Sequence, residues 1–157
     1  MIKLQDTNLI IEEKPAFTLV GIVKDFAYER CFQDIPLYWR EFLSNPEKPV
    51  RGEYGVCINK DNCMRYMIAD VYNPHQTLFA FHEVVSFEAG LWAMFSATGP
   101  LPEALQEVTD FVWKKWVPGN REYEVADNRS IEFYPHTVRD SEYTHSEIWL
   151  PISKKRT

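Results

Sequence analysis

The order strand, helix, strand, strand occurs twice along the 157 residues, and this repetition limits the fold more than any other feature of the sequence. In the first half, an apolar run predicts a strand over 17–23, and apolar residues at helical spacing predict a helix over 34–44. A hairpin is predicted over 52–72, with the turn letters NKDN between its strands. The letters over 73–84 are typical of a loop.

The second half repeats this order. Strands are predicted over 87–99, 121–135 and 146–152, and a helix is predicted over 100–119. The letters FTLVGI correspond to LWAMFSA, and YMIADVY corresponds to EIWLPI about 80 residues later, which is too long a period for a solenoid repeat.

The duplication predicts an α+β fold in which two βαββ units, at about 1–80 and 81–157, make one domain over 1–157. We expect a pseudo-two-fold axis between the units. Their strands would then form one antiparallel-rich sheet platform, covered by two main helices. A central cleft is expected where the halves meet, and such interfaces are common ligand sites.

The first predicted helix has an expected N-terminus and an apolar face. Asp34 is expected to be the N-cap, and Pro36 fits the first turn. The apolar face consists of Ile35, Tyr38, Trp39 and Phe42.

One carboxylate interrupts the apolar run of the last predicted strand. Glu147 precedes the letters IWLPI, where a buried carboxylate costs free energy. The repeat aligns Met67 with Glu147, so the fold does not require a charge at this position. Glu147 is interpreted either as a solvated strand end or as a charge kept in an apolar cleft.

Aromatic residues are abundant, with five Trp, eight Tyr and ten Phe. This excess fits an aromatic-rich core, and it also fits a ligand pocket with aromatic walls. For Trp39, Trp92 and Trp149 the alternative to a pocket is ordinary core packing. For Tyr134 the alternative is a structural hydrogen bond.

Charge and length patterns exclude several functions. The net charge is −6, and the short terminal run from Lys154 is the single basic cluster, so we expect no direct nucleic-acid binding. No apolar run approaches a membrane span, and no leader signature precedes the first strand. Three cysteines without a CxxC motif favour reduced thiols, and we expect a cytoplasmic protein.

The sequence predicts neither a metal site nor a cofactor. The four histidines, His75, His82, His136 and His145, lack metal-ligand spacing. The sequence also contains no phosphate loop, nucleophile elbow or dinucleotide fingerprint.

Seven segments spread over nearly the whole chain carry a family resemblance. They are KPAFTLVGI, IPLYWREF, YGVCIN, AGLWAMFSATGPLPEALQEV, WKKWVP, IEFYP and SEIWLPI. In this order and spacing, they resemble the GyrI-like small-molecule-binding domains. These domains are also the effector-binding domains of multidrug-sensing and arabinose-regulator-class transcription factors. The chain lacks the DNA-binding domain of these regulators, so we expect a stand-alone member.

The resemblance implies a central cleft for hydrophobic, often cationic, compounds. Through the EIWLPI motif it assigns Glu147 to the cleft. It also implies that Trp39, from the helix motif W-x-x-F, and Tyr134, from IEFYP, line the cleft. The further expected ligand-binding residues are Met67, Tyr72, Trp92 and Trp149.

Three functions fit this resemblance. The first is binding of a hydrophobic, possibly cationic or planar aromatic molecule, in drug or toxin sensing or sequestration. The second is hydrolysis of the cyclopropane of cyclopropanoid genotoxins, with Glu147 holding the water and a tyrosine assisting. Tyr134 is the expected catalytic tyrosine, and Tyr72 and Tyr143 are the alternatives. The third is inhibition of DNA gyrase, or an association with a transcription regulator.

Overall fold

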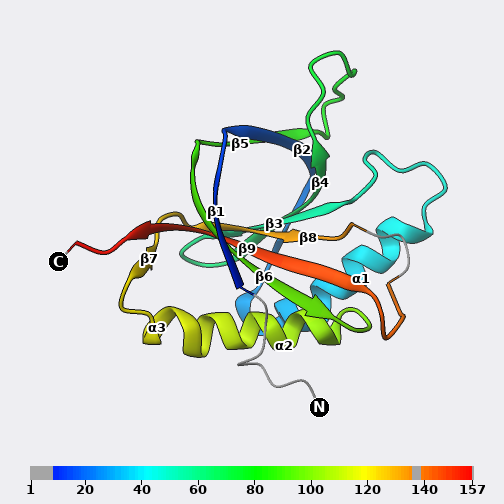
Figure 1. The fold of residues 1–157 in the computed structure, drawn as a ribbon. Helices are drawn as coiled ribbons and strands as arrows, with labels where there is room; N and C mark the ends of the chain where they lie inside the picture. The colour runs from blue at the N-terminus through cyan, green and yellow to red at the C-terminus, as the bar shows by residue number, and fades with distance from the viewer. Residues whose placement is uncertain (1–8, 136–138, 157) are drawn as a thin grey trace.

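The computed structural model describes residues 9–135 and 139–156, which form one curled sheet with helices on one side (Figure 1). The strands are β1 Leu9–Lys14, β2 Phe17–Phe26, β3 Tyr54–Asn59, β4 Met64–Val71, β5 Glu83–Phe87, β6 Gly90–Thr98, β7 Tyr123–Val125, β8 Arg129–Phe133 and β9 His145–Lys154. The helical segments are η2 Tyr28–Arg30, α1 Cys31–Ser44, α2 Glu103–Phe111, the π-helical turn η3 Val112–Trp116 and α3 Val117–Gly119. No helix in these described ranges is both long and apolar enough to cross a membrane.

The strand order confirms the predicted duplication. The first unit consists of β2, α1, β3 and β4, and the second consists of β6, α2, β8 and β9. Along the sheet the order is β1-β6-β9-β8-β3-β4-β2-β5, and β7 pairs with β9 as a side branch. From the antiparallel β3–β8 pair outward, the two units follow the same order, as a pseudo-two-fold axis between these strands requires.

The two units exchange their edge strands, and this exchange curls the sheet. β1 pairs with β6 of the second unit, yet it continues into β2 of the first unit after Pro15 and Ala16. β5 pairs with β2, yet it continues into β6 after Glu88 and Ala89. Because two residues cannot span a wide gap, the two ends of the sheet must lie close together. β1 and β5 are these two ends, and in Figure 1 β1 runs up to β2, which pairs with β5.

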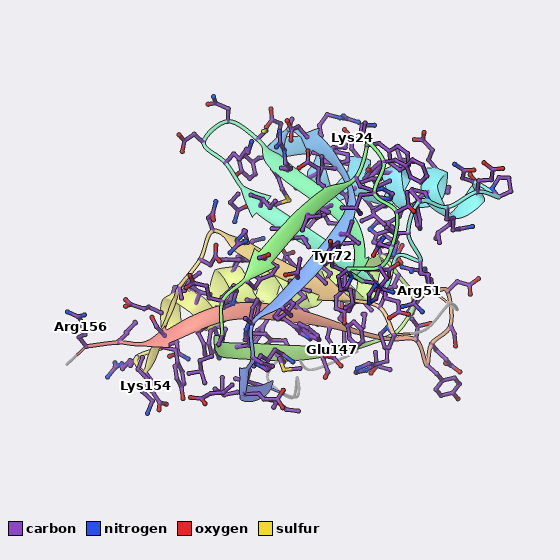
Figure 2. All side chains as sticks on the ribbon, turned by 90° about the horizontal axis from the view of Figure 1, so that it is seen from above. Lys24, Arg51, Tyr72, Glu147, Lys154 and Arg156 are labelled. Atoms are coloured by element: carbon purple, nitrogen blue, oxygen red, sulfur yellow. The ribbon has the colours of Figure 1, made fainter. Side chains whose placement is uncertain are left out.

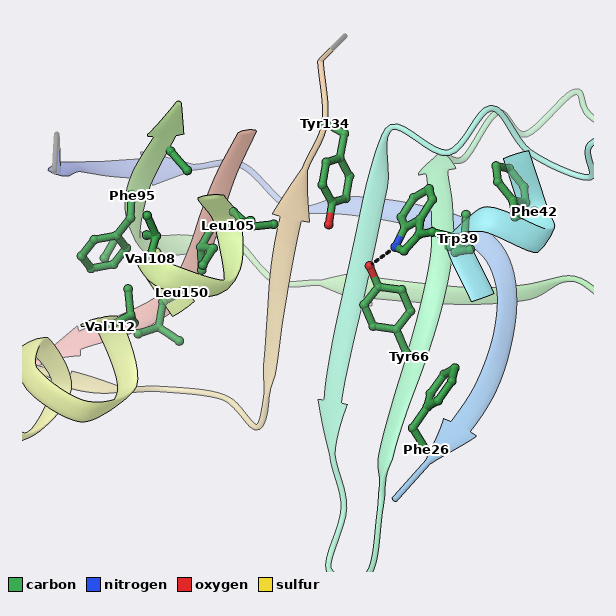
Figure 3. Packing of buried hydrophobic residues seen from close by; sticks show 14 of the residues in the cluster. Phe26, Trp39, Phe42, Tyr66, Phe95, Leu105, Val108, Val112, Tyr134 and Leu150 are labelled. Atoms are coloured by element: carbon green, nitrogen blue, oxygen red, sulfur yellow. Dashed lines mark hydrogen bonds between the residues drawn. The ribbon is translucent and has the colours of Figure 1, made fainter. Parts of the chain in front are cut away.

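Both faces of the curled sheet are covered. Inside the curl, buried apolar residues form a cluster that includes Leu19, Met67, Trp92 and Trp149. On the other face, α1 and α2 cover a second cluster that includes Trp39 and the residues drawn in Figure 3. A strand with two covered faces cannot be assigned an inner side from the alternation of its residues alone.

Two edge strands differ from the predicted elements. The sequence pattern predicts no strand at β1, and it predicts a loop that runs into β5. Both strands pair on one side only and are mostly exposed, so they carry little of the alternation that marks a half-buried strand. The segment predicted as one strand over 121–135 contains two, β7 and β8.

The first helix begins earlier than predicted. α1 starts at Cys31, so Asp34 lies within its first turn rather than at the N-cap. There its carboxylate accepts hydrogen bonds from the Arg30 guanidinium at 3.2 Å. Pro36 consequently lies inside the helix. The predicted apolar face is confirmed, because Trp39 and Phe42 on that face are buried.

Candidate functional site

A cavity of about 500 Å³ lies between α1, α2 and the helix-covered face of the sheet. This volume is in the range of ligand pockets for drug-sized molecules. Its walls are mostly aromatic and aliphatic, with a few polar groups. The lining includes Cys31, Phe32, Ile35, Pro36, Trp39, Cys57, Leu101, Leu105, Gln106, Trp113, Glu132, Tyr134 and Arg139.

Glu132 contributes a carboxyl group to the floor of this cavity. On β8 the alternation of side chains turns Glu132 toward the helices, whereas its neighbours Ile131 and Phe133 pack inside the curl. Burial raises the pKa of the Glu132 carboxyl, and hydrogen bonds from Tyr134 and Tyr66 offset part of this rise. Glu132 therefore binds a proton at higher pH than a solvated glutamate does.

Two tyrosines hold this carboxyl, and a tryptophan hydrogen-bonds one of them. The hydroxyls of Tyr66 and Tyr134 donate to the same oxygen, Oε1 of Glu132, at 2.5 and 2.6 Å. The Tyr66 hydroxyl accepts a hydrogen bond from Trp39 Nε1 at 2.7 Å (Figure 3). Burial raises the pKa of both tyrosines well above the usual range, so their hydroxyls remain protonated donors. Among the described residues, the partner of Glu132 Oε2 is a weak donor, the Cys57 thiol at 4.0 Å.

Gly55 makes room for this cluster. It lies directly opposite Glu132 in the β3–β8 pair. A Cβ at Gly55 would lie 2.1 Å from the Tyr66 hydroxyl oxygen and 2.9 Å from Glu132 Oε1. Contacts this short do not occur in packed proteins, so the Tyr66–Glu132 hydrogen bond requires glycine at this position.

Arg139 lines the cavity beside the same aromatic rings. Its guanidinium carbon lies 4.6 Å from the ring centroid of Trp39 and 4.8 Å from that of Tyr134. Its Nη2 donates to the carbonyl oxygen of Gly52 at 3.1 Å. Gly52 has a φ of +83°, and a Cβ there would lie 2.8 Å from the Phe42 ring. Glycine therefore lets the backbone approach the α1 aromatics and present this carbonyl to Arg139.

A hydrogen bond joins the two helices at the rim of the cavity. Pro36 has no N–H, so the Phe32 carbonyl lacks the donor that a helix normally supplies four residues later. The side-chain amide of Gln106 on α2 donates to this carbonyl at 3.0 Å. Phe32 is exposed, and all three residues line the cavity, so this bond bridges its opening.

A second depression, of about 850 Å³, adjoins the cavity. Leu43, Tyr134 and Arg139 line both spaces. Asp70 lies in the depression, where its carboxylate accepts hydrogen bonds from the backbone N–H groups of Arg51 and Glu53. The fold therefore already uses this carboxylate.

The structure brings two of the seven predicted site residues together in the cavity. Trp39 and Tyr134 both line it, and their rings are 5.1 Å apart. Three others, Met67, Trp92 and Trp149, are buried inside the curl, on the opposite face of the sheet. They belong to the core of the curl rather than to the cavity wall.

Glu147 does not line the cavity that Trp39 and Tyr134 line. Glu147 pairs with Phe133, one residue from Glu132, and its side chain therefore points to the other face of the sheet. There it accepts a hydrogen bond from Trp149 Nε1 at 2.7 Å, and His145 Nε2 lies 2.7 Å from its other oxygen. Figure 2 locates Glu147 on β9. A ligand-binding role for Glu147 stays a prediction.

The other predicted tyrosines also lie outside the cavity lining. Tyr72 directly follows β4 and is half-buried (Figure 2). Tyr143 is 78% exposed. His136, which the sequence excludes as a metal ligand, lies outside the described residues.

Sequence reasoning missed four residues, Tyr66 and Gly55 next to the cavity lining, and Glu132 and Arg139 within it. Two signals pointed to the first three. A glycine inside the predicted strand YGVCIN indicates a close approach of another group. The letters E-F-Y in IEFYP place a carboxylate and a tyrosine on one face of a strand. Arg139 lies in a connection between strands, where spacing predicts no direction.

The family follows from a comparison over most of the chain. Residues 10–152 match the family model described as Cass2, integron-associated effector binding protein. The chain belongs to this family. The membership confirms the predicted resemblance to GyrI-like effector-binding domains. No curated protein sequence matches the chain significantly.

Solved structures share the fold at low sequence identity. SAV2435 bound to tetraphenylphosphonium is 24% identical, with a TM-score of 0.68 over 93% of this chain and 94% of that chain. The integron cassette protein VCH_CASS2, from the mobile metagenome of Vibrio cholerae, is 18% identical, with a TM-score of 0.68 over 92% and 95% of the two chains. The EcmrR C-terminal domain is 15% identical, with a TM-score of 0.64 over 96% and 99%.

Proposed function

We propose that the protein binds hydrophobic cations in the cavity between α1 and α2, with Glu132 as the counter-charge. The observation that carries this proposal is a carboxyl group deep in a mostly apolar cavity, with one oxygen held by two tyrosine hydroxyls. A carboxylate in such surroundings lacks solvation. A lipophilic cation restores a favourable partner while its apolar groups stay out of water.

The aromatic wall adds to this attraction. The rings of Trp39 and Tyr134 lie next to the carboxyl, and a cation over such a ring gains about 0.5–2 kcal/mol. Trp113 and Phe32 supply further apolar surface near the opening. These contacts require bulk and hydrophobicity rather than a particular hydrogen-bond pattern, so they suit chemically varied ligands.

The comparisons support the same ligand class. SAV2435, a relative with this fold, was solved with tetraphenylphosphonium, a bulky organic cation. EcmrR, whose C-terminal domain shares the fold, also forms a complex with DNA. Drug or toxin sensing for a regulatory system, or sequestration of the toxin, is the role that we propose for the family member described here.

Calorimetric titration with tetraphenylphosphonium tests the proposal. We expect saturable one-site binding by the wild type and a loss of about 10-fold or more in affinity for Glu132→Gln. Glu147→Gln is the matched control, because it removes the same charge from the opposite face of the sheet. The assignment fails if Glu132→Gln binds as tightly as the wild type, or if Glu147→Gln alone weakens binding.

Hydrolysis of cyclopropanoid compounds is a second candidate function. The observation in its favour is a carboxyl of raised pKa next to a tyrosine hydroxyl inside a cavity. Glu132, in the place predicted for Glu147, would accept a proton from water as the water oxygen bonds to the cyclopropane carbon. The ring bond would break toward a phenolate oxygen that Tyr134 hydrogen-bonds, and the proton on Glu132 would then pass to that oxygen.

Incubation with a cyclopropanoid compound and mass spectrometry separates hydrolysis from binding. A product one water heavier, formed by the wild type and absent with Glu132→Gln, supports the enzyme. Unchanged compound after long incubation supports binding alone.

Gyrase inhibition stays a prediction, and a supercoiling assay without effect at micromolar protein would remove it.

A further inference from the structure

A guanidinium group lies on the aromatic wall of the cavity with no anionic partner among the described residues. Arg139 stacks on Trp39 and Tyr134, and its backbone carbonyl accepts a hydrogen bond from Leu101 N at 2.7 Å. One side-chain donor, Nη2, reaches the Gly52 carbonyl. These contacts fix the group in place, so its position is not that of a loose surface side chain.

The remaining donors of Arg139 are unused in the described part of the chain. A guanidinium carries five N–H donors, and the Nε of Arg139 is buried without a hydrogen-bond partner there. Arg139 also forms no ion pair within 4.0 Å with any described carboxylate. A partly buried charge with unsatisfied donors is costly unless a partner arrives.

Arg129 shows how the same chain treats a comparable arginine. The Arg129 guanidinium stacks on Phe87 at 4.2 Å, and its side chain is likewise largely buried. Yet Arg129 donates through Nε and Nη2 to the carboxylate of Asp127 and through Nη1 to the carbonyl of Ser86. The stacking is therefore similar at the two sites, and Arg139 differs in that no described carboxylate pairs with it.

Glu132 does not supply that carboxylate. Its Oε1 is held by Tyr66 and Tyr134, and no ion pair joins Glu132 to Arg139 among the described residues. Tyr134 separates the two groups, with its ring under the guanidinium and its hydroxyl on Glu132. One cavity wall thus presents an acid and a base that do not neutralise each other.

We propose that the preferred ligand is amphoteric, a flat aromatic cation that also carries a carboxylate, and that Arg139 binds this carboxylate. The inference rests on the proposed cation site at Glu132 and adds the second half of the ligand. The ligand's carboxylate accepts hydrogen bonds from the unused donors of Arg139 and supplies the missing counter-charge. Its aromatic core lies against the wall that both residues share.

Two dyes that differ by one ester test the proposal. Rhodamine B is a zwitterion at neutral pH, and its ethyl ester is a cation with the same ring system. We expect fluorescence anisotropy to give about 10-fold tighter binding of the acid than of the ester, as one charge-assisted hydrogen-bond pair contributes. Arg139→Met should abolish this preference while ester binding persists, and Arg139→Lys should keep part of it.

The outcomes separate this inference from the cation site. The role of Arg139 is overturned if the ratio of the affinities for rhodamine B and its ethyl ester is the same in Arg139→Met as in the wild type. It is also overturned if the wild type binds the ester more tightly than the acid. If Glu132→Gln does not change the affinity for the ester, the cation site at Glu132 is contradicted. The ratio of the two dye affinities then still tests the role of Arg139 independently. If neither dye binds the folded wild type, both proposals are contradicted. Urea unfolding of each variant checks that the fold is intact.

Discussion

Replacement of Gly55 by alanine separates the geometry of the site from ordinary strand propensity. Glycine inside a strand costs about 0.5–1 kcal/mol relative to alanine, so propensity alone predicts that Gly55→Ala stabilises the protein. The structure predicts the opposite, because the new Cβ would lie 2.1 Å from the Tyr66 hydroxyl oxygen. Tyr66 is 0% exposed and packs against Trp39 and Phe26, so its ring cannot move aside freely.

The magnitude follows from the hydrogen bonds that the displaced hydroxyl loses. A hydrogen bond to a charged group contributes about 1.5–3 kcal/mol, and a neutral one contributes about 0.5–1.5 kcal/mol. Tyr66 makes one of each kind, to Glu132 and from Trp39. After subtraction of the propensity gain, we expect Gly55→Ala to lower the free energy of unfolding by about 1–4 kcal/mol.

Urea unfolding followed by tryptophan fluorescence measures this change. Tyr66→Phe is the reference background, because it removes the hydroxyl that the new Cβ would strike. Gly55→Ala should therefore cost less in the Tyr66→Phe protein than in the wild type. A Gly55→Ala protein with unchanged or raised stability and an unchanged m-value would refute the steric argument.

Four other predictions concern the same cavity. Because the pKa of Glu132 is raised, tetraphenylphosphonium affinity should fall as pH drops through that pKa, and calorimetry should find no such fall for Glu132→Gln. A raised folded-state pKa also means that the stabilisation from Glu132 is complete below its unfolded pKa and is lost as pH rises through the folded pKa. As the pH rises from acidic to neutral, urea titrations should therefore find a larger loss in the free energy of unfolding for the wild type than for Glu132→Gln. Equal losses in the two proteins would contradict the raised pKa of Glu132. Gln106→Leu removes the bridge to the Phe32 carbonyl, so stopped-flow dissociation of the cation should be faster, with a stability cost of about 1 kcal/mol or less; an unchanged rate would argue against a role at the opening. Burial raises the pKa of the Cys57 thiol well above its usual range, so mass spectrometry should find slow alkylation that a bound cation slows further; labelling as fast as in unfolded protein would be inconsistent with this burial.

The sheet and its symmetry could be predicted because they depend on order and spacing. Each unit carries one amphipathic helix between a strand and a hairpin, and these elements are long enough to be recognised singly. The pairing of the units at β3–β8 then follows from the need to bury the apolar face of each helix on a shared sheet. The exchanged edge strands could not be predicted, since short exposed strands lack a distinct pattern.

The cavity carboxyl, Glu132, could not be predicted for a related reason. In the segment IEFY, the apolar residues Ile131 and Phe133 alternate with Glu132 and Tyr134, and this alternation alone does not show that the second face of the strand is covered as well. That face is in fact covered by α1 and α2. Glu147 was predicted as the cleft carboxylate because it precedes an apolar run. Its side chain points into the curl, where His145 and Trp149 are its hydrogen-bond partners.

Arg139 illustrates a limit of a different kind. Its position is set by contacts with Trp39, Tyr134, Gly52 and Leu101, which come from four separate parts of the chain. No local pattern encodes such a convergence. The family resemblance also assigned no residue at this position.

A crystal structure of the chain with bound tetraphenylphosphonium tests the central claim most directly. The proposed site places the phosphonium between α1 and α2, against the rings of Trp39 and Tyr134 and nearer to Glu132 than to Glu147. Crystals of the Glu132→Gln variant, soaked with tetraphenylphosphonium in parallel, should contain the cation at lower occupancy. A phosphonium inside the curl beside Glu147, or one bound only on the outer surface, would contradict the account.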